Sequence, residues 1–286
     1  MAPGMEVIVS KKLYGGTINL MGKSFRKFGW NAVFVDNDNP EAFRSAVTEK
    51  TRAIFVESLA NPGGVIVDLE AIAKIAQEAE VPLIVDNTMA TPWLCRPFEW
   101  GADLVVHSTT KFLSGQGNAM GGIVIDSGRF PWFGNAKYPS LSEPSPDYNG
   151  LTFAETFGDL AFTLYSHAVS LRDLGCTQSP MNAWITLNGV ETLPLRMERH
   201  VENAQKVAGF LQQHPSVEWV SYAGLSSSPY YQLAQKYLQG KAGSVFTFGI
   251  RGGYESGLRL LEKVELFSHV SNIGDSRSLI LHPAST

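Results

Sequence analysis

The sequence predicts an α/β protein whose large domain, built on a mostly parallel sheet, is followed by a smaller C-terminal α/β domain. Short β-branched runs alternate with helix-like segments along the first two thirds of the 286 residues. Each run is apolar almost throughout, which is typical of strands covered on both faces of a parallel sheet. Strand–helix–strand alternation favours right-handed crossover connections.

Five runs are predicted to be strands: residues 32–36, 52–58, 82–88, 102–108 and 121–126. Between them, residues 40–47 and 68–80 carry apolar side chains at helical spacing. Asp68 stands where the second helix should begin, and its carboxylate is suited to cap the free backbone N–H groups there.

The segment after the sheet changes in character. Residues 127–150 are rich in Pro, Gly, Ser and aromatic side chains and predict a long ordered loop, which is often functional. A helical stretch is expected to follow to about Leu174. Two more helices are expected, one opened by Ser179-Pro180 and one from about Leu193 to Gln213, because proline is favoured in the first helical turn.

The last part of the chain predicts further strands in residues 217–224, 243–253 and 279–285, and an amphipathic helix in residues 253–265. We therefore predict a large domain over residues 1–190 and a small domain over residues 191–286.

Composition excludes several classes of protein. A hydrophobic fraction of 44% with 17% charged residues predicts a globular chain with a sizeable core. A net charge of −4 gives no basic surplus for nucleic acid or for an anionic membrane. Two cysteines cannot build a disulfide framework, and the start of the chain lacks the apolar core of a signal peptide. We expect a cytoplasmic protein.

Polar residues stand at or just after the ends of three predicted strands: Glu57 and Asn61, then Asp86, then Ser108, Thr110 and Lys111. In an open parallel sheet, ligands bind outside the C-terminal ends of the strands. We therefore expect these side chains to meet at one edge of the sheet.

The chemistry of Asp86 and Lys111 suits pyridoxal 5′-phosphate (PLP). Lys111 follows hydroxyl residues and precedes a glycine-rich segment, and hydroxyls and backbone N–H groups bind a phosphate monoester. A lysine whose pKa is lowered forms a Schiff base with an aldehyde. Asp86 would keep a pyridine nitrogen protonated. A surface lysine and a turn aspartate are the ordinary alternatives for each residue taken alone.

The other motifs in the sequence give little support for a nucleotide or metal site. Residues 115–122, GQGNAMGG, precede a predicted strand, whereas a dinucleotide fingerprint opens a helix. No phosphate loop of the form G-x-x-x-x-G-K-S/T occurs, and the six histidines show no metal-ligand spacing. In residues 13–17, LYGGT, the Tyr14 ring either stacks on a flat cofactor or ends a strand before a turn.

The chain resembles the Cys/Met-metabolism family of PLP-dependent enzymes, the fold type I group that includes cystathionine γ-synthase and γ-lyase. The motifs LYGGT, ESLANPGG, VDNTMATPWL, HSTTKFLSGQG, ETLPLRMERH and SNIGDSRSLILHPAST occur in the family's order. The resemblance covers essentially the whole chain and implies the PLP-dependent transferase fold type I.

The resemblance implies a role for each matching position. Lys111 would be the Schiff-base lysine and the proton shuttle. The other residues follow: Asp86 would pair with the pyridine nitrogen, Ser108 and Thr110 would bind the phosphate, Tyr14 would stack on the ring, Asn61 would lie near the 3′-oxygen, and Ser271 would lie near the substrate carboxylate.

The implied reaction is γ-replacement in methionine and cysteine biosynthesis. Sulfide or a small thiol would replace the acetate of O-acetylhomoserine to give homocysteine or its thioether. The segments GNAMGGIVIDSGRFPW and RDLGCTQSPMNA favour the members that use this substrate. The alternatives are a cystathionine γ-synthase, a γ-lyase, or a non-catalytic remnant. Family members are expected to be homotetramers built from dimers.

Both ends of the chain depart from the family pattern. The sequence starts shortly before LYGGT, where family members already have an N-terminal region, and it stops before their carboxylate-binding arginine. The resemblance therefore implies a member truncated at both ends, and we expect this chain alone to be poorly soluble or inactive.

Overall fold

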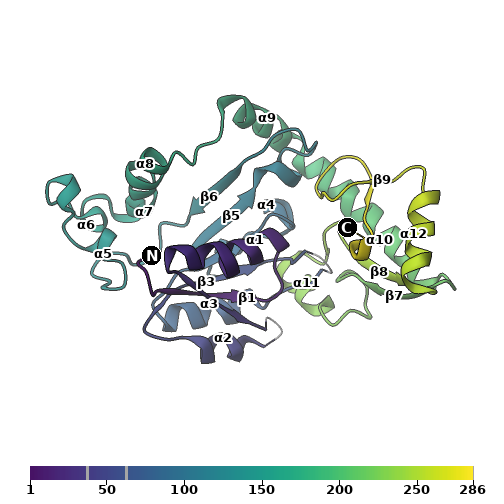
Figure 1. The fold of residues 1–286 in the computed structure, drawn as a ribbon, viewed down its shortest axis with the longest axis horizontal. Helices are drawn as coiled ribbons and strands as arrows, with labels where there is room; N and C mark the ends of the chain where they lie inside the picture. The colour runs from purple at the N-terminus through teal and green to yellow at the C-terminus, as the bar shows by residue number, and fades with distance from the viewer. Residues whose placement is uncertain (37–38, 62–63, 286) are drawn as a thin grey trace.

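A six-stranded sheet forms the centre of the protein in the computed structural model, which describes residues 1–36, 39–61 and 64–285. Pro62 and Gly63 of the ESLANPGG motif, and Thr286 at the end of the last motif, lie outside the described residues. Figure 1 shows the sheet in the middle of the molecule, the helices that follow β6 at one end, and the C-terminal elements at the other.

The sheet has the strand order β2-β1-β3-β4-β5-β6. The strands are β1 (Glu6–Ser10), β2 (Asn31–Val35), β3 (Thr51–Glu57), β4 (Leu83–Asp86), β5 (Leu104–Ser108) and β6 (Gly122–Asp126). All neighbours pair in parallel except β5 and β6, which are antiparallel. The predicted α/β class with a mostly parallel sheet is confirmed, while β1 has no counterpart among the predicted strands.

Successive side chains of the inner strands enter two different cores, because residues along a strand alternate between its faces. On one face, Val7, Val9, Ala53 and Phe55 pack with Met21 in the segment after β1. That segment comprises α1 (Gly15–Asn19), a π-helical turn (Leu20–Ser24) and a 3₁₀ turn (Phe25–Phe28). On the other face, Ile8, Ile54 and Val56 belong to the main core. Strands β1 and β3 are thus covered on both faces, as the apolar composition of residues 52–58 predicts for β3.

Strand β6 differs from its predicted environment. It lies at the edge of the sheet and runs antiparallel to β5, and Ile123, Val124 and Ile125 are exposed. The predicted burial on both faces is wrong here: successive side chains alternate between the faces, and because all three are exposed, the described residues cover neither face of β6.

The predicted helices beside the sheet are present as α2 (Pro40–Ala46) and α3 (Leu69–Glu78). The Asp68 carboxylate accepts a hydrogen bond from the N–H of Ala71 at 3.3 Å, which confirms the predicted cap. Helix α3 buries Leu69, Ile72 and Ile75 in the main core. The shorter turns α4 (Thr91–Leu94) and Pro97–Trp100 connect β4 to β5.

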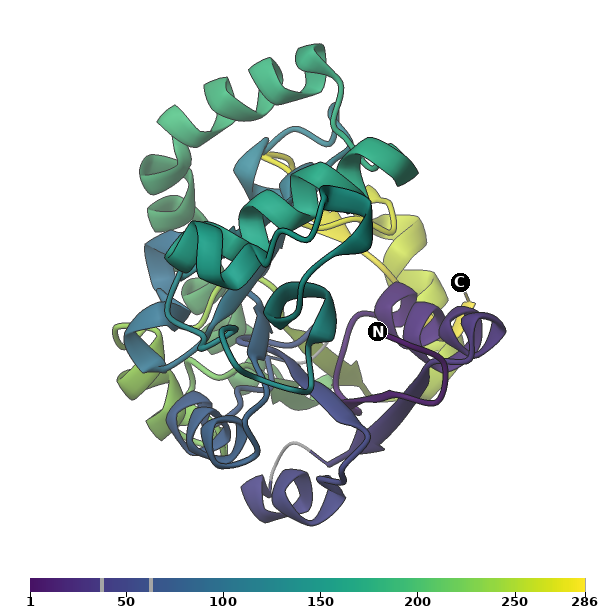
Figure 2. The same cartoon turned by 90° about the vertical axis from the view of Figure 1, so that its left-hand side faces the viewer.

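Residues 127–150 form a long loop with two short turns, α5 (Pro139–Ser142) and a 3₁₀ turn at Pro146–Tyr148. The helical stretch that follows consists of α6 (Phe153–Phe157), a 3₁₀ turn (Gly158–Leu160), α7 (Ala161–Tyr165), a π-helical turn (Ser166–Leu171) and α8 (Arg172–Leu174). Loop and helices share a small aromatic core around Phe130, Trp132 and Phe153. Figure 2 looks at this end of the molecule, with the teal helices in front.

Two long helices then lead to the C-terminal elements. Helix α9 (Pro180–Glu191) begins at Ser179, whose hydroxyl accepts a hydrogen bond from the N–H of Asn182, and α10 (Leu193–Gln213) follows after one residue. Both helices were expected from the proline positions. Helix α10 places Met197, Val201 and Ala208 in the same core as the sheet residues.

The C-terminal elements comprise two small sheets and two helices. Strand β7 (Val217–Ser221) pairs antiparallel with β8 (Thr247–Ile250), and β9 (Ser268–His269) pairs in parallel with β10 (Leu279–Ile280). Helix α11 (Tyr231–Tyr237) was not predicted, whereas α12 (Gly253–Lys263) was; a final 3₁₀ turn spans Pro283–Ser285. The predicted boundary between residues 190 and 191 stays a prediction. None of the described helices is long and apolar enough to cross a bilayer.

The packing of α10 predicts a large difference between two leucine-sized side chains. Met197 is completely buried, whereas Leu195 is 71% exposed. Met197→Ala should lower the free energy of unfolding by about 2–5 kcal/mol, because it leaves a cavity in the main core. Leu195→Ala, the matched control, should change it by less than about 1 kcal/mol. Denaturant unfolding measures both, and equal losses would contradict the shared core.

Candidate active site

The C-terminal ends of β1, β3, β4 and β5 lie at one edge of the sheet because these strands are parallel. Glu57 ends β3 and Asp86 ends β4, and the two residues are paired in register. Neighbours in register project their side chains to the same face. The strand ends therefore converge at one edge, as predicted.

Asp86 is held by a short chain of hydrogen bonds. Its Oδ1 accepts from the N–H of Thr88 at 2.9 Å, and the N–H of Ser108 donates to Thr88 Oγ1 at 2.8 Å. Thr88 thus fixes β4 and β5 to each other at the site. Burial raises the pKa of Asp86, and no described lysine, arginine or histidine forms an ion pair with it. A buried carboxylate of this kind is stabilised by a cation.

Lys111 lies in a π-helical turn, Thr109–Leu113, directly after β5. Its backbone, with φ −93° and ψ −125°, breaks the helical geometry of the turn. Irregular backbone of this kind is frequent at functional sites. The side chain is partly buried, which lowers the pKa of its amine. Lys111 Nζ donates to Asn272 Oδ1 at 2.6 Å.

The segment around Asn272 packs closely against the lysine turn. Gly274 has φ +75°, and a Cβ atom there would lie 2.4 Å from the N of Phe112 and 2.7 Å from the carbonyl carbon of Lys111. The N–H of Ser276 donates to the carbonyl of Gly115 at 3.0 Å. Glycine is required at position 274 because both the left-handed backbone and the close contact exclude a side chain.

Asn272 is a site residue that the sequence analysis missed. It is the neighbour of Ser271, which was predicted to lie near the substrate, and the described hydrogen bond of the Lys111 amine goes to Asn272 and not to Ser271. Ser271 is exposed. A one-residue difference within SNIGD could not be resolved without knowing how that segment turns, although an amide beside a predicted site residue was a usable signal.

The hydroxyl groups next to Lys111 differ in their hydrogen bonding. Thr110 Oγ1 donates to the carbonyl of Gly121 at 3.3 Å and accepts from its N–H at 3.1 Å. The Ser108 hydroxyl makes no hydrogen bond to the described residues, and the buried Thr109 Oγ1 also has no partner there. The Ser108 hydroxyl is therefore available to donate a hydrogen bond to an oxyanion. The Thr110 hydroxyl instead connects the lysine turn to the start of β6.

Tyr14 and Asn61 are brought to the site by Glu57. The N–H of Tyr14 donates to Glu57 Oε1 at 2.6 Å, and the N–H of Asn61 donates to Glu57 Oε2 at 3.1 Å. The Tyr14 side chain is 53% exposed, and its ring lies over Gly16, where a Cβ atom would be 2.4 Å from Tyr14 Cε1. The ring is thus available at the site edge, and Gly16 provides room for it.

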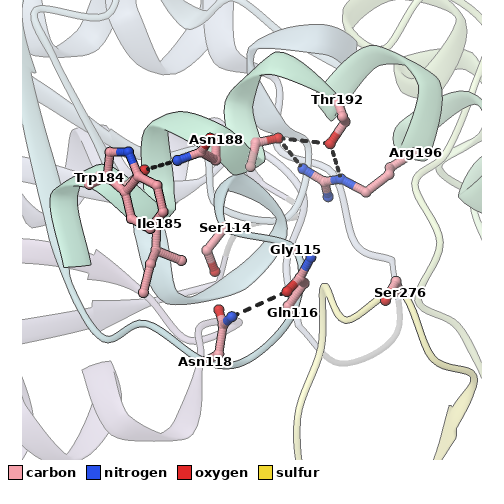
Figure 3. A pocket seen from close by; sticks show the side chains of 11 residues that line it. Ser114, Gly115, Gln116, Asn118, Trp184, Ile185, Asn188, Thr192, Arg196 and Ser276 are labelled. Atoms are coloured by element: carbon pink, nitrogen blue, oxygen red, sulfur yellow. Dashed lines mark hydrogen bonds between the residues drawn. The ribbon is translucent and has the colours of Figure 1, made fainter. Parts of the chain in front are cut away.

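Arg196 joins α10 to the end of the lysine turn. Its Nη1 donates to the carbonyl of Phe112 at 2.8 Å, its Nη2 to the carbonyl of Gly189 at 2.7 Å, and its Nε to Thr192 Oγ1 at 3.1 Å. Arg196 lines a pocket of about 320 Å³ together with Asn188 and Trp184, and Figure 3 shows it next to Thr192. Because its donors are used by neutral acceptors of the chain, Arg196 supports the lysine turn.

The residues at the sheet edge fit PLP. A partly buried amine of lowered pKa suits the aldehyde, a largely buried carboxylate without a described cation suits a protonated ring nitrogen, and the free Ser108 hydroxyl suits a phosphate. Fold and site together define an α/β protein with the features of a PLP-binding site, in which a parallel sheet carries the lysine just beyond one of its strands.

Comparison with known proteins gives the family. Residues 1–286 match the model of the Cys/Met metabolism PLP-dependent enzymes, and the chain belongs to this family. It is 50% identical to an O-acetyl-L-homoserine sulfhydrylase of Leptospira meyeri and 46% identical to O-acetyl-L-homoserine sulfhydrylase 1 of Thermus thermophilus. The matches cover 99% of this chain in both cases, and 66% and 68% of those proteins.

A solved structure agrees with this assignment. A Campylobacter jejuni protein, described as an O-acetylhomoserine (thiol)-lyase and carrying N′-pyridoxyl-lysine-5′-monophosphate, superposes with a TM-score of 0.95 at 39% identity. The match covers 99% of this chain and 70% of that protein. The fold type I prediction is therefore confirmed. The chain spans about two thirds of the length of the curated relatives it matches.

The contact at Gly274 generates a stability prediction. Gly274→Ala adds a methyl group against the backbone of the lysine turn, whereas Gly253→Ala adds one where no atom lies within 4 Å, at a similar φ of +61°. Both variants carry backbone strain of about 1 kcal/mol. Gly274→Ala should lose at least about 1 kcal/mol more in denaturant unfolding, since overpacking adds to the strain. Equal losses would show that the two segments do not touch.

Proposed function

We propose that the protein of which this chain is part or whole catalyses a PLP-dependent γ-replacement. O-acetylhomoserine and sulfide, or a small thiol, would give homocysteine, or its thioether, and acetate. The observation that carries the proposal is the pair of Asp86 and Lys111 on adjacent parallel strand ends, within a chain whose relatives include O-acetyl-L-homoserine sulfhydrylases.

Each residue of the site has a proposed task toward PLP. When bound, PLP would supply an electron sink for negative charge at the substrate's α-carbon. Asp86 would hold the ring nitrogen in its protonated form, and Ser108 with Thr110 would bind the phosphate. Tyr14 would stack on the ring, and Asn61 would lie near the 3′-oxygen. The exposed face of Tyr14 and the free hydroxyl of Ser108 support these tasks.

Lys111 would bind the cofactor aldehyde in the resting protein and move protons during the reaction. Burial lowers the pKa of its amine, so a larger fraction is neutral and able to accept a proton. The amine would take protons from the α- and β-carbons of the substrate. The γ-carbon–oxygen bond then breaks with release of acetate, a bond from sulfur to the γ-carbon forms, and protons return to the carbons.

The substrate carboxylate would lie beside the SNIGD segment, near Ser271. Asn272, which accepts a hydrogen bond from Lys111 Nζ, would keep the amine directed toward the reacting carbons. A cytoplasmic homotetramer is the proposed assembly. The exposed apolar side chains of α9, Met181, Trp184 and Leu187, support self-association because apolar patches of this kind mark interfaces.

The reaction is tested with the purified protein at its natural length, O-acetylhomoserine and sulfide. Homocysteine with acetate is the expected product, whereas 2-ketobutyrate and ammonia would indicate a γ-lyase. Cystathionine formed from cysteine in place of sulfide would indicate a γ-synthase. Absence of all three products in folded protein that binds PLP would indicate a non-catalytic remnant.

Lys111→Ala should lower kcat/KM by roughly 10³-fold or more, because both the bond to the aldehyde and the proton transfers are lost. The yellow absorbance band of the wild-type protein with PLP should be absent from the variant. Lys111→Arg is the matched control for charge, and it should be as inactive as Lys111→Ala because a guanidinium stays protonated. Activity retained in either variant would contradict the role of Lys111.

Asn272→Ala and Ser271→Ala form a matched pair that separates two neighbours. Asn272→Ala should lower kcat by roughly 10-fold, because the Lys111 amine loses the hydrogen bond that directs it. Ser271→Ala should act mainly on the KM for O-acetylhomoserine. Steady-state kinetics measure both, and a kcat loss confined to Ser271→Ala would reverse the two assignments.

A further inference from the structure

Glu57 is a buried carboxyl that has no task in the proposed reaction. It is 4% exposed at the end of β3, and its two oxygens accept hydrogen bonds from backbone N–H groups on two separate segments. Tyr14 lies 43 residues before it and Asn61 four residues after it. One carboxylate therefore connects the turn that opens α1 with the loop that follows β3.

One ionisable group of the described chain influences the pKa of Glu57. Asp86 on β4 is the one charged group of the described chain that shifts its pKa, while the α1 side and the loop after β3 contribute the two N–H groups. Burial, with a smaller contribution from Asp86, raises the pKa of Glu57 to about 8. Both protonation states of this carboxyl are therefore accessible near neutral pH.

We propose that Glu57 is a positioning residue whose ionised carboxylate holds the Tyr14 and Asn61 segments at the edge of the cofactor site, and whose protonation loosens at least one of these two ties. Only the identity of the ligand at this edge, pyridoxal 5′-phosphate, rests on the proposed function. The hydrogen bonds themselves are independent of any ligand.

Protonation changes the number of hydrogen bonds that the Glu57 carboxyl group can accept. An ionised carboxylate has two equivalent acceptor oxygens and makes charge-assisted hydrogen bonds, whereas a protonated carboxyl keeps one good acceptor and gains a donor. A cation held by Asp86 would offset the repulsion between the two acids and favour ionised Glu57. Binding of a cationic ring at Asp86 and tightening of the two segments would then favour each other.

The first test measures amide hydrogen exchange of Tyr14 and Asn61 in cofactor-free protein at pH 6.5 and 9.5, corrected for intrinsic rates. In the wild type, protection of at least one of the two amides should rise roughly 10-fold or more with pH, as the carboxylate ionises. In Glu57→Gln, whose amide offers one acceptor oxygen at every pH, protection should not change with pH.

Asp103→Asn is the matched control. Asp103 is a partly buried acid of raised pKa, about 6, and it accepts a hydrogen bond from the N–H of Leu83 at 2.8 Å, at the opposite end of β4. This variant should keep the wild-type pH response at Tyr14 and Asn61. Protection that does not change with pH in the wild type, or that changes equally in Glu57→Gln, would overturn the proposal.

The contribution of Glu57 to global stability cannot imitate the expected result, because that contribution changes in the opposite direction. The folded-state pKa of Glu57 lies above its ordinary value of 4.5, so the folded protein binds more protons than the unfolded chain between these values. The contribution of Glu57 to the free energy of unfolding is therefore greatest below about pH 4.5 and is lost as the pH rises through about 8. Exchange by global unfolding would become faster with pH, not slower.

The second test measures the dissociation constant of pyridoxal 5′-phosphate by absorbance titration. Glu57→Gln should bind it roughly 10-fold more weakly than the wild type, and Asp103→Asn should bind it equally well. Equal binding by Glu57→Gln would overturn the link between Glu57 and the cofactor site. If the wild type itself fails to bind, the proposed function fails, while the exchange measurement still decides whether Glu57 ties the two segments.

Discussion

The parallel pairing of β1, β3, β4 and β5 is the constraint on which the site depends. Parallel strands place their C-terminal ends at one edge, and ligands bind outside those ends in open α/β sheets. Asp86 and Lys111 are each at most three residues beyond such an end. The sheet itself therefore places both residues at the same edge.

Burial determines the charge states that are favoured at the edge of the sheet. Burial raises the pKa values of Glu57 and Asp86 and lowers that of Lys111, so every shift opposes charge. Two acids and one amine are thereby held ready for partners that supply the missing charge. A ligand with a cationic ring and an aldehyde meets both needs, which connects the burial of these groups to the chemistry proposed for them.

The local sequence predicts most of this arrangement, because strand ends and helix caps depend on residues close in the chain. Asp68 and Ser179 cap helices as expected, and Asp86 and Lys111 lie where their apolar runs end. The direction and exposure of β6 depend instead on whether another layer covers it. Chain-distant contacts were the least predictable, since Asn272 reaches Lys111 across 161 residues and no local pattern encodes that distance.

The C-terminal segment is thus part of the site and not an accessory to it. Asn272 contacts the lysine, Gly274 fits against the lysine backbone, and Arg196 on α10 donates to the carbonyl of Phe112. The π-helical turn is therefore held by two elements that follow the large sheet in sequence. Since Lys111 has irregular backbone angles within that turn, its position depends on these contacts as much as on β5. A movement of α10 or of the SNIGD segment would shift the amine directly, so the chain couples the arrangement of its C-terminal part to the position of its reactive group.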